Sequence, residues 1–249
     1  MAVISNLVNA SRLNLFYQGL KTKFATKDSV DSINDLLNAY DVVEEVVTIT
    51  PEELPDFFSY MGRYLYRDWN LQVSGGTLDT ALTLKNFYGP GRIRFIAANE
   101  NNLPVFAGGV FALRSRIQIT FSNIIIKSST LNGGYAFRSE DSGYIAITGA
   151  NSKITSDDGT GIGILANCGS TIDMTNGTIS NLNRLCIVQH CGTLALQDVT
   201  LEDLNNGIQC WGSGTVFISG STNETVATTG ASISGGMIVN SSGQPLTQG

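Results

Sequence analysis

From about Ile93 to the C-terminus, short stretches in which apolar and polar residues alternate return at a regular interval. Such alternation is typical of a β-strand with one buried face. Successive equivalent positions are 24, 28, 27, 22, 22 and 22 residues apart: Ile93, Ile117, Ile145, Ile172, Leu194, Val216 and Ile238. A period in this range is typical of a solenoid. We therefore predict a mainly β fold, a single-stranded right-handed parallel β-helix of about six to seven coils.

Each repeat also contains two further short strands. Those of the second rank, at 123–127, 153–155, 178–180, 200–202 and 225–227, place Thr, Ser, Lys and Glu outward, so we expect a solvated face. Those of the third rank, at 110–113, 162–165, 185–188 and 208–211, are apolar on both sides. A strand of this kind is normally buried on both sides. We therefore predict that this face packs against other copies of the chain.

The predicted interface residues follow from strict alternation along the third rank. If Ile162, Ile164, Leu185, Ile187 and Ile208 point into the solenoid, their neighbours point out. The residues expected outside, and therefore at the interface, are Phe111, Leu113, Leu165, Cys186, Val188 and Trp211.

The N-terminal part is predicted to be helical. Residues 1 to about 40 carry apolar side chains at helical spacing, among them Leu13, Phe16, Tyr17, Leu20 and Phe24. The sequence Thr-Pro-Glu-Glu at 50–53 is typical of a helix start, and the helix that it begins would extend to Trp69. We therefore divide the chain into a small helical N-terminal module, residues 1–75, and a β-helix domain, residues 76–249. Residues 77–92 are expected to cover the first coil.

Composition and charge exclude several classes of partner. The 249-residue chain has a net charge of −6 and a pI near 4.7, so no nucleic-acid partner is expected. It has no apolar run of eighteen residues, so no membrane span is expected. The first residues do not resemble a secretion signal, so we expect synthesis and folding in a cytoplasm, with the four cysteines as thiols.

Two turns after the third rank bring together cysteine and histidine. Coils lie about 4.8 Å apart, and aligning residues 167–169 with 190–192 places Cys168 over Cys191 and Asn167 over His190. Stacked, reduced thiols are the leading interpretation and a disulfide the second. A zinc site is the third, because only two cysteines and one histidine converge where zinc needs three or four ligands. No metal and no cofactor is therefore expected.

Two acidic pairs follow second-rank strands and are the candidate catalytic residues. Asp157 and Asp158 lie two coils before Glu202 and Asp203. Two coils would separate Asp158 from Asp203 by roughly 9–10 Å, near the upper end of the range for the carboxylates of an inverting glycosidase. Paired aspartates beside glycine are also typical of turns, and we rank the turn interpretation first.

Asp157 and Asp158, followed by His190, resemble the paired-Asp and later His-Gly motifs of polygalacturonases, which are β-helix enzymes. Here Cys191 stands in place of the motif's glycine, and that family's Asn-x-Asp and Arg-x-Lys elements do not occur in order. The carboxylates support an alternative hypothesis, a tailspike-like polysaccharide depolymerase, which would be a glycoside hydrolase or lyase that uses acidic residues on the β-helix.

The segment Leu15–Lys27, LFYQGLKTKFATK, is similar to the N-terminal particle-attachment segments of tailed-bacteriophage virion proteins. A helical module followed by a Gly/Ser/Thr-rich β-helix resembles their tail spikes, tail fibres, neck appendages and head fibres. This resemblance implies a homotrimer located on the virion. Residues 1–75 would bind other virion proteins, through Leu13, Phe16, Tyr17, Leu20 and Phe24, and the β-helix would project toward a host cell-surface glycan.

Three functions are consistent with these features. The leading hypothesis is a non-enzymatic virion structural protein that presents a β-helix for host adhesion. The alternative is a tailspike-like polysaccharide depolymerase. A bacterial surface adhesin is the third, and the missing secretion signal disfavours it.

Overall fold

The computed structural model describes residues 45–65, 67–223, 229, 231–240, 242, 243 and 245. The chain divides into two compact units, residues 1–44 and residues 45–249. The predicted N-terminal helix and its expected anchoring residues, Leu13, Phe16, Tyr17, Leu20 and Phe24, lie outside the described residues. The second unit begins at Glu45, so residues 45–75, predicted to be part of the helical module, belong to the same unit as the β-helix.

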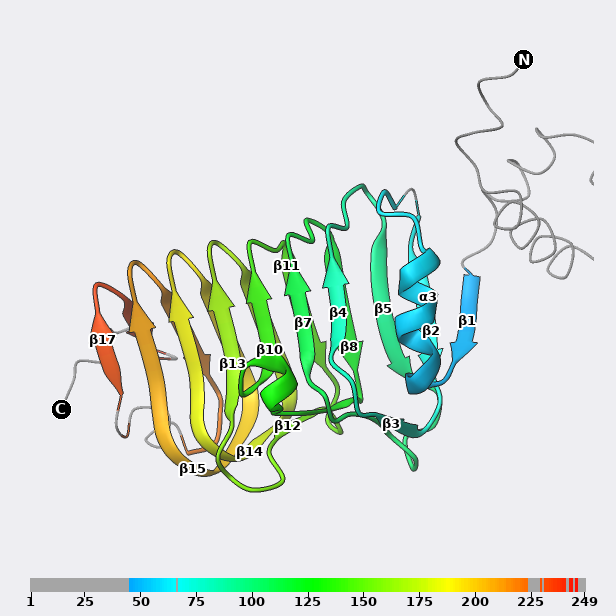
Figure 1. Cartoon of the computed structure of the whole chain (residues 1–249). Coiled ribbons are helices and arrows are strands. Elements are labelled where there is room, and N and C mark those ends of the chain that lie inside the picture. Colours follow the sequence, from blue (N-terminus) through cyan, green and yellow to red (C-terminus); the bar gives the residue numbers. More distant parts are fainter. Residues whose placement is uncertain are drawn as a thin grey trace, which may run out of the picture. The chain divides into compact units, whose positions relative to one another are not determined.

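The second unit is a parallel β-solenoid of about eight turns, which confirms the predicted fold with slightly more coils than expected (Figure 1). Nine strands stack in its first rank, each parallel to the next. They are β1 (Glu45–Ile49), β2 (Trp69–Val73), β5 (Arg92–Ala97), β8 (Gln118–Ser122), β11 (Tyr144–Thr148), the first parts of β14 (Thr171–Gln189) and β15 (Thr193–Trp211), β16 (Thr215–Ser219) and β18 (Met237–Val239).

The other two ranks complete each coil. The second rank contains β3 (Gly76–Leu78), β6 (Pro104–Phe106), β9 (Ile125–Lys127), β12 (Lys153–Thr155) and the middle parts of β14 and β15. The third contains β4 (Leu82–Lys85), β7 (Val110–Leu113), β10 (Tyr135–Glu140), β13 (Ile162–Asn167), the last parts of β14 and β15, and β17 (Ser232–Ser234). A 3-10 turn, η2 (Thr130–Asn132), precedes β10.

The register of the first rank corrects one predicted equivalence. Ile93 pairs with Ile119, and Ile119 pairs with Ile145, so both steps are 26 residues. The prediction chose Ile117, which is also buried but lies in the turn before β8. Because side chains alternate with a period of two, a shift of two residues leaves the apolar pattern unchanged. Alternation alone therefore cannot separate Ile117 from Ile119.

The N-terminal end of the solenoid is covered by the short helices η1 (Pro51–Glu53) and α3 (Leu54–Tyr60). The predicted start is confirmed: the Thr50 N–H donates to Glu53 Oε2 at 2.9 Å. The helix ends earlier than expected. Its Phe58 is buried and packs on Phe87 and Phe95, with ring centroids 5.9 and 5.7 Å away. Residues 77–92, expected to form the cover, instead form strands and a turn of the first complete coil.

The interior of the first coils is filled by stacked aromatic rings. Phe95 and Phe121 occupy paired positions on β5 and β8, and their rings are parallel with centroids 4.7 Å apart. Phe106 and Phe137 pack edge-on against Phe121 at 6.3 and 5.4 Å. All four side chains are fully buried. Later coils replace these rings with Ile, Leu, Val and Met, so one apolar core runs along the solenoid.

The corner between the third and first ranks has the same backbone geometry in seven successive coils. One residue at this register position has a positive φ in each coil: Asn86, Arg114, Asp141, Cys168, His190, Gly212 and Gly235. Asn, Asp and Gly adopt this left-handed conformation most readily. The abundance of these residues between the apolar repeats is therefore a consequence of the corners. None of the helices in the described residues is long and apolar enough to span a membrane.

Candidate functional site

The outer surface of β7, β10, β13 and the last parts of β14 and β15, here called the third face, carries an apolar row. Phe111 pairs with Arg138, Arg138 with Leu165, and Leu165 with Ile187 on successive coils. The Arg138 guanidinium lies 4.8 Å from the Phe111 ring centroid and binds Glu140 at 2.7 Å. The Arg138 charge is paired with Glu140, so the aliphatic part of its side chain can lie on the face and continue the apolar row between Phe111 and Leu165.

Two residues predicted for this face lie in the core instead. Cys186 and Val188 are fully buried and face the interior beside Ile208 and Cys210. The cause lies at the preceding corner, where Leu185 and Cys186 are both fully buried. Two successive inward residues reverse the alternation that follows. Ile187 therefore points outward, contrary to the prediction.

The other predicted interface residues keep their predicted side. Four of them point outward: Phe111, Leu113, Leu165 and Trp211. Phe111 and Leu113 alternate with the buried Val110 and Ala112, and Trp211 follows the buried Cys210. Leu165 pairs in register with the outward Ile187. Whether they contact another copy stays a prediction.

Ile187 is the member of the apolar row that sequence reasoning missed. A glycine signal marks its corner: Gly163 and Gly207 flank the Leu185 position in neighbouring coils. A Cβ on Gly163 would lie 3.1 Å from the Leu182 side chain and 3.6 Å from that of Ile154, both of which are buried. Glycine at that position indicates a place where an extra residue faces the core.

Asp158 is held within its own turn. Its Oδ1 accepts hydrogen bonds from Ser156 Oγ at 2.6 Å, Thr160 N–H at 3.0 Å and Thr160 Oγ1 at 2.8 Å. These bonds, that of Ser156 first, lower the pKa of Asp158 to about 2. The carboxylate is therefore ionised at neutral pH and cannot be the general acid that a glycosidase requires. The neighbouring Asp157 binds Lys127 Nζ at 2.7 Å.

We predict that the Asp158 carboxyl titrates near pH 2, below the roughly 3.9 of an unfolded Asp. Because its folded pKa is lowered, its stabilising bonds are fully present above the unfolded pKa and are lost as the pH falls through the folded one. Carboxyl carbon chemical shifts measured against pH would give the midpoint. Ser156→Ala should raise it, and Ser59→Ala, at a distant exposed serine, should not. A wild-type midpoint above 4 contradicts the turn assignment.

The second acidic pair lies on a different coil and is not joined to the first. Glu202 is exposed and pairs in register with Ser180, and Asp203 follows it at a corner with a φ of 48°. In the part of the chain that the structure describes, no hydrogen bond links Glu202 or Asp203 to Asp157 or Asp158. Among those residues, no three His, Cys, Asp or Glu side chains converge as a metal site.

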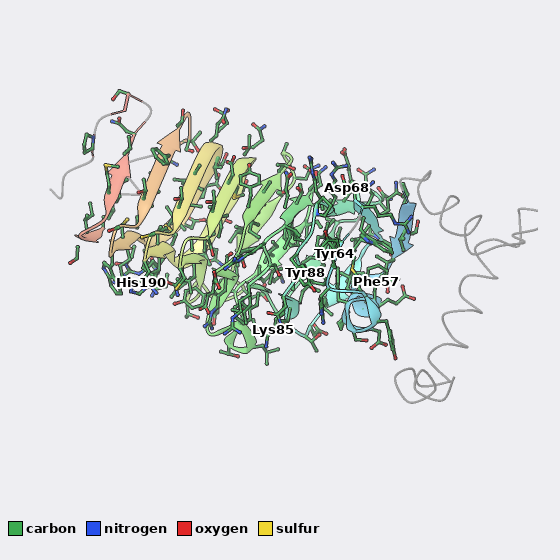
Figure 2. All side chains as sticks on the ribbon, turned by 90° about the horizontal axis from the view of Figure 1, so that it is seen from above. Phe57, Tyr64, Asp68, Lys85, Tyr88 and His190 are labelled. Atoms are coloured by element: carbon green, nitrogen blue, oxygen red, sulfur yellow. The ribbon has the colours of Figure 1, made fainter. Side chains whose placement is uncertain are left out.

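The cysteine–histidine turns are shifted by one residue from their predicted stacking. Asn167 pairs with Gln189, so Cys168 lies beside His190 and not beside Cys191. The predicted proximity of Asn167 and His190 is present between side chains, with His190 Nδ1 2.9 Å from Asn167 Oδ1. Cys168 and Cys191 are exposed and free, and Cys186 and Cys210 are buried and free. Figure 2 shows His190 in the half of the solenoid away from α3.

Comparisons of the chain with protein-family models, with curated proteins and with solved structures find no match in any of the three.

Proposed function

We propose that this chain is a non-enzymatic structural protein of a tailed-bacteriophage virion, of the fibre, spike, appendage or head-fibre kind. Copies pack side by side through the third face as a homotrimer, and the remaining faces of the β-helix meet the host surface. The observation that carries this proposal is the outward apolar row on a regular solenoid of about eight turns, in which Phe111 and Ile187 are half-buried and Leu165, between them, is 4% exposed.

The apolar row supports self-association because it lies on a rigid, extended surface. Burying apolar area stabilises an interface by roughly 25 cal/mol per Å², and parallel copies would align their rows over the successive coils from Phe111 to Ile187. A closed ring with rotational symmetry satisfies each copy equally. Leu113 lies on the same face of β7 and would widen the contact there, and Trp211 would extend it to β15.

The other two faces carry polar columns that suit contact with solvent and sugar hydroxyls, and the first face also bears exposed apolar side chains such as Ile96 and Phe217. On the first, Thr171, Thr193 and Thr215 form a column across three coils. On the second, Thr178, Thr200 and Thr222 form another. Such regular hydroxyl columns leave these faces available for a host glycan. Attachment to the particle is assigned to the N-terminal residues, including Leu13, Phe16, Tyr17, Leu20 and Phe24.

Replacing Ile187 by glutamate is the test of assembly. We expect the wild-type protein to be trimeric at micromolar concentration by mass photometry and Ile187→Glu to be mainly monomeric, because the new charge would be buried without a partner. Thr200→Glu adds the same charge to the second face and should remain trimeric. Circular dichroism would confirm that both variants fold.

Two results would overturn this assignment. The first is a wild-type protein that stays monomeric at micromolar concentration. The second is equal assembly of Ile187→Glu and Thr200→Glu. Location on the particle is tested separately, by mass spectrometry of purified virions from the source culture, where absence of the chain would contradict the virion assignment.

A further inference from the structure

We propose that one corner of the N-terminal coils binds an anionic glycan through carboxylate or other acidic groups on its sugars. This basic corner consists of Lys85, Arg92, Arg114 and Arg116 together with Tyr64 and Tyr88. The inference rests on the proposed adhesive function for its choice of a glycan, and it adds the chemical class of the ligand.

The six residues come from three segments that the coil register brings together. Tyr88 N–H donates to Arg63 O at 3.0 Å, and Leu65 N–H donates to Tyr88 O at 2.8 Å, which places Tyr64 beside Tyr88. Arg116 lies on the next coil, and its N–H donates to Phe87 O at 2.8 Å. Figure 2 shows Tyr64, Tyr88 and Lys85 in the half of the solenoid near α3, far from His190.

The four cations are exposed and only weakly neutralised. The Arg116 side chain is 77% exposed and meets Asp141 at 3.8 Å, a distance and exposure at which an ion pair contributes little. The other acids beside the corner have partners of their own: Asp68 binds the Arg94 guanidinium at 3.2 Å and accepts the backbone N–H of Arg92, and Glu140, beside Arg114, binds Arg138 at 2.7 Å. Lys85, Arg92 and Arg114 are exposed, and the described part of the chain shows no ion pair to their side chains.

This positive charge contrasts with the rest of the chain. The whole protein has a net charge of −6, and no Lys or Arg follows Arg184. A cluster of cations within three neighbouring coils of such a chain creates a local positive field. At physiological ionic strength that field extends over a Debye length of about 8 Å. An anionic polymer would therefore be attracted to this corner and repelled by the acidic C-terminal coils.

Two exposed tyrosines give the corner a second property that suits a sugar. Tyr64 and Tyr88 are 43% and 52% exposed, and their rings meet edge to face with centroids 5.2 Å apart. An amphipathic ring of this kind offers an apolar face to the C–H face of a sugar, and its hydroxyl can bond sugar hydroxyls. The neighbouring guanidinium groups match carboxylates in a bidentate geometry.

The same pair of rings favours a glycan over a nucleic acid. Proteins that bind single strands stack successive bases on successive aromatic platforms. Tyr64 and Tyr88 are inclined at 80° and so do not form two parallel platforms. Nucleic-acid binding also depends on a basic protein surface more extensive than this one.

Binding of the full chain to polygalacturonate, measured by biolayer interferometry at low and high salt, tests the proposal. We expect salt-sensitive binding to polygalacturonate and none to neutral dextran. Arg92→Gln with Arg116→Gln should weaken binding at least about tenfold, because two charge-assisted contacts are lost. Lys127→Gln with Lys153→Gln removes the same charge from the second rank and should leave the affinity unchanged. Tyr88→Ala should weaken binding while retaining its salt dependence.

Three results would overturn the proposal. One is no binding to polygalacturonate, and another is an equal loss in the two double variants. The third is tighter binding to single-stranded DNA through the same residues, which would assign the corner to nucleic acid. Mass photometry of the same samples keeps the outcomes separate, because a trimer that does not bind polygalacturonate refutes the basic corner and leaves the assembly proposal intact.

Discussion

Replacing Phe121 by alanine is expected to lower the free energy of unfolding by about 3–5 kcal/mol. Phe121 stacks on Phe95 and contacts Phe106 and Phe137, so its removal leaves a cavity bounded by three rings. These rings belong to successive coils and different ranks, and the backbone cannot close around the space without breaking the strand ladder. Chemical denaturation followed by far-UV circular dichroism would measure the loss.

The matched control for this prediction is Phe217→Ala. Phe217 lies on β16, the same rank of the solenoid, but its side chain points outward and is 44% exposed. Phe217→Ala should therefore lower the free energy of unfolding by much less than the about 3–5 kcal/mol expected for Phe121→Ala. Similar losses for Phe121→Ala and Phe217→Ala would show that the aromatic stack does not hold the first coils together. Solenoids can unfold coil by coil. The denaturant dependence of unfolding should therefore be compared between each variant and the wild type, because a changed slope indicates a departure from two-state unfolding.

The β-helix was predictable because its evidence is local and repeated. Every coil from Ile93 onward carries inward apolar residues at the same place, and the structure pairs those positions. The first two coils were missed because Trp69 and Glu45 occupy the position of Ile93. The pairing continues through the backbone there, although the side chains no longer resemble the repeat.

The facing of the third rank was only partly predictable. Alternation assigns a side chain to the inside or outside relative to its neighbours, so one extra inward residue at a corner reverses the rest of the strand. Leu185 and Cys186 provide that extra residue, which places Val188 inside and Ile187 outside. Asp158 forms bonds to Ser156 and Thr160 that are typical of a turn, which agrees with the turn interpretation of its pair, and the roles of Glu202 and Asp203 stay a prediction.

The basic corner could not be predicted from the sequence. Its residues are spread over three segments, near Tyr64, between Lys85 and Arg92, and between Arg114 and Arg116. None of these segments is a charge run. They become neighbours only through a register of 24 to 28 residues, and the prediction did not extend the repeat back to Tyr64.

Thiol labelling tests the corrected facing of the third rank directly. We expect Cys168 and Cys191 to react rapidly with a maleimide in the native protein, because both are exposed. Cys186 should react at least about a thousandfold more slowly, since its sulfur is reached only when the solenoid opens. Burial also raises the pKa of the Cys186 thiol well above its ordinary value, so little reactive thiolate forms. Peptide mass spectrometry after timed quenching would resolve the four sites.

The variant Cys168→Ser/Cys191→Ser isolates the two buried thiols and supplies the control. Burial also raises the pKa of Cys210, but Cys210 lies one coil nearer the C-terminal end than Cys186, so local opening should expose it sooner. The expected order of labelling is therefore Cys168 and Cys191 first, Cys210 next and Cys186 last. Had strict alternation held, Cys186 would lie on the third face beside Leu165 and would react early in a monomer. If Cys186 were labelled as fast as Cys168 in the monomeric Ile187→Glu protein, Cys186 would not face the core. Ile187, the next residue, would then not point outward, and the assembly proposal depends on that outward position.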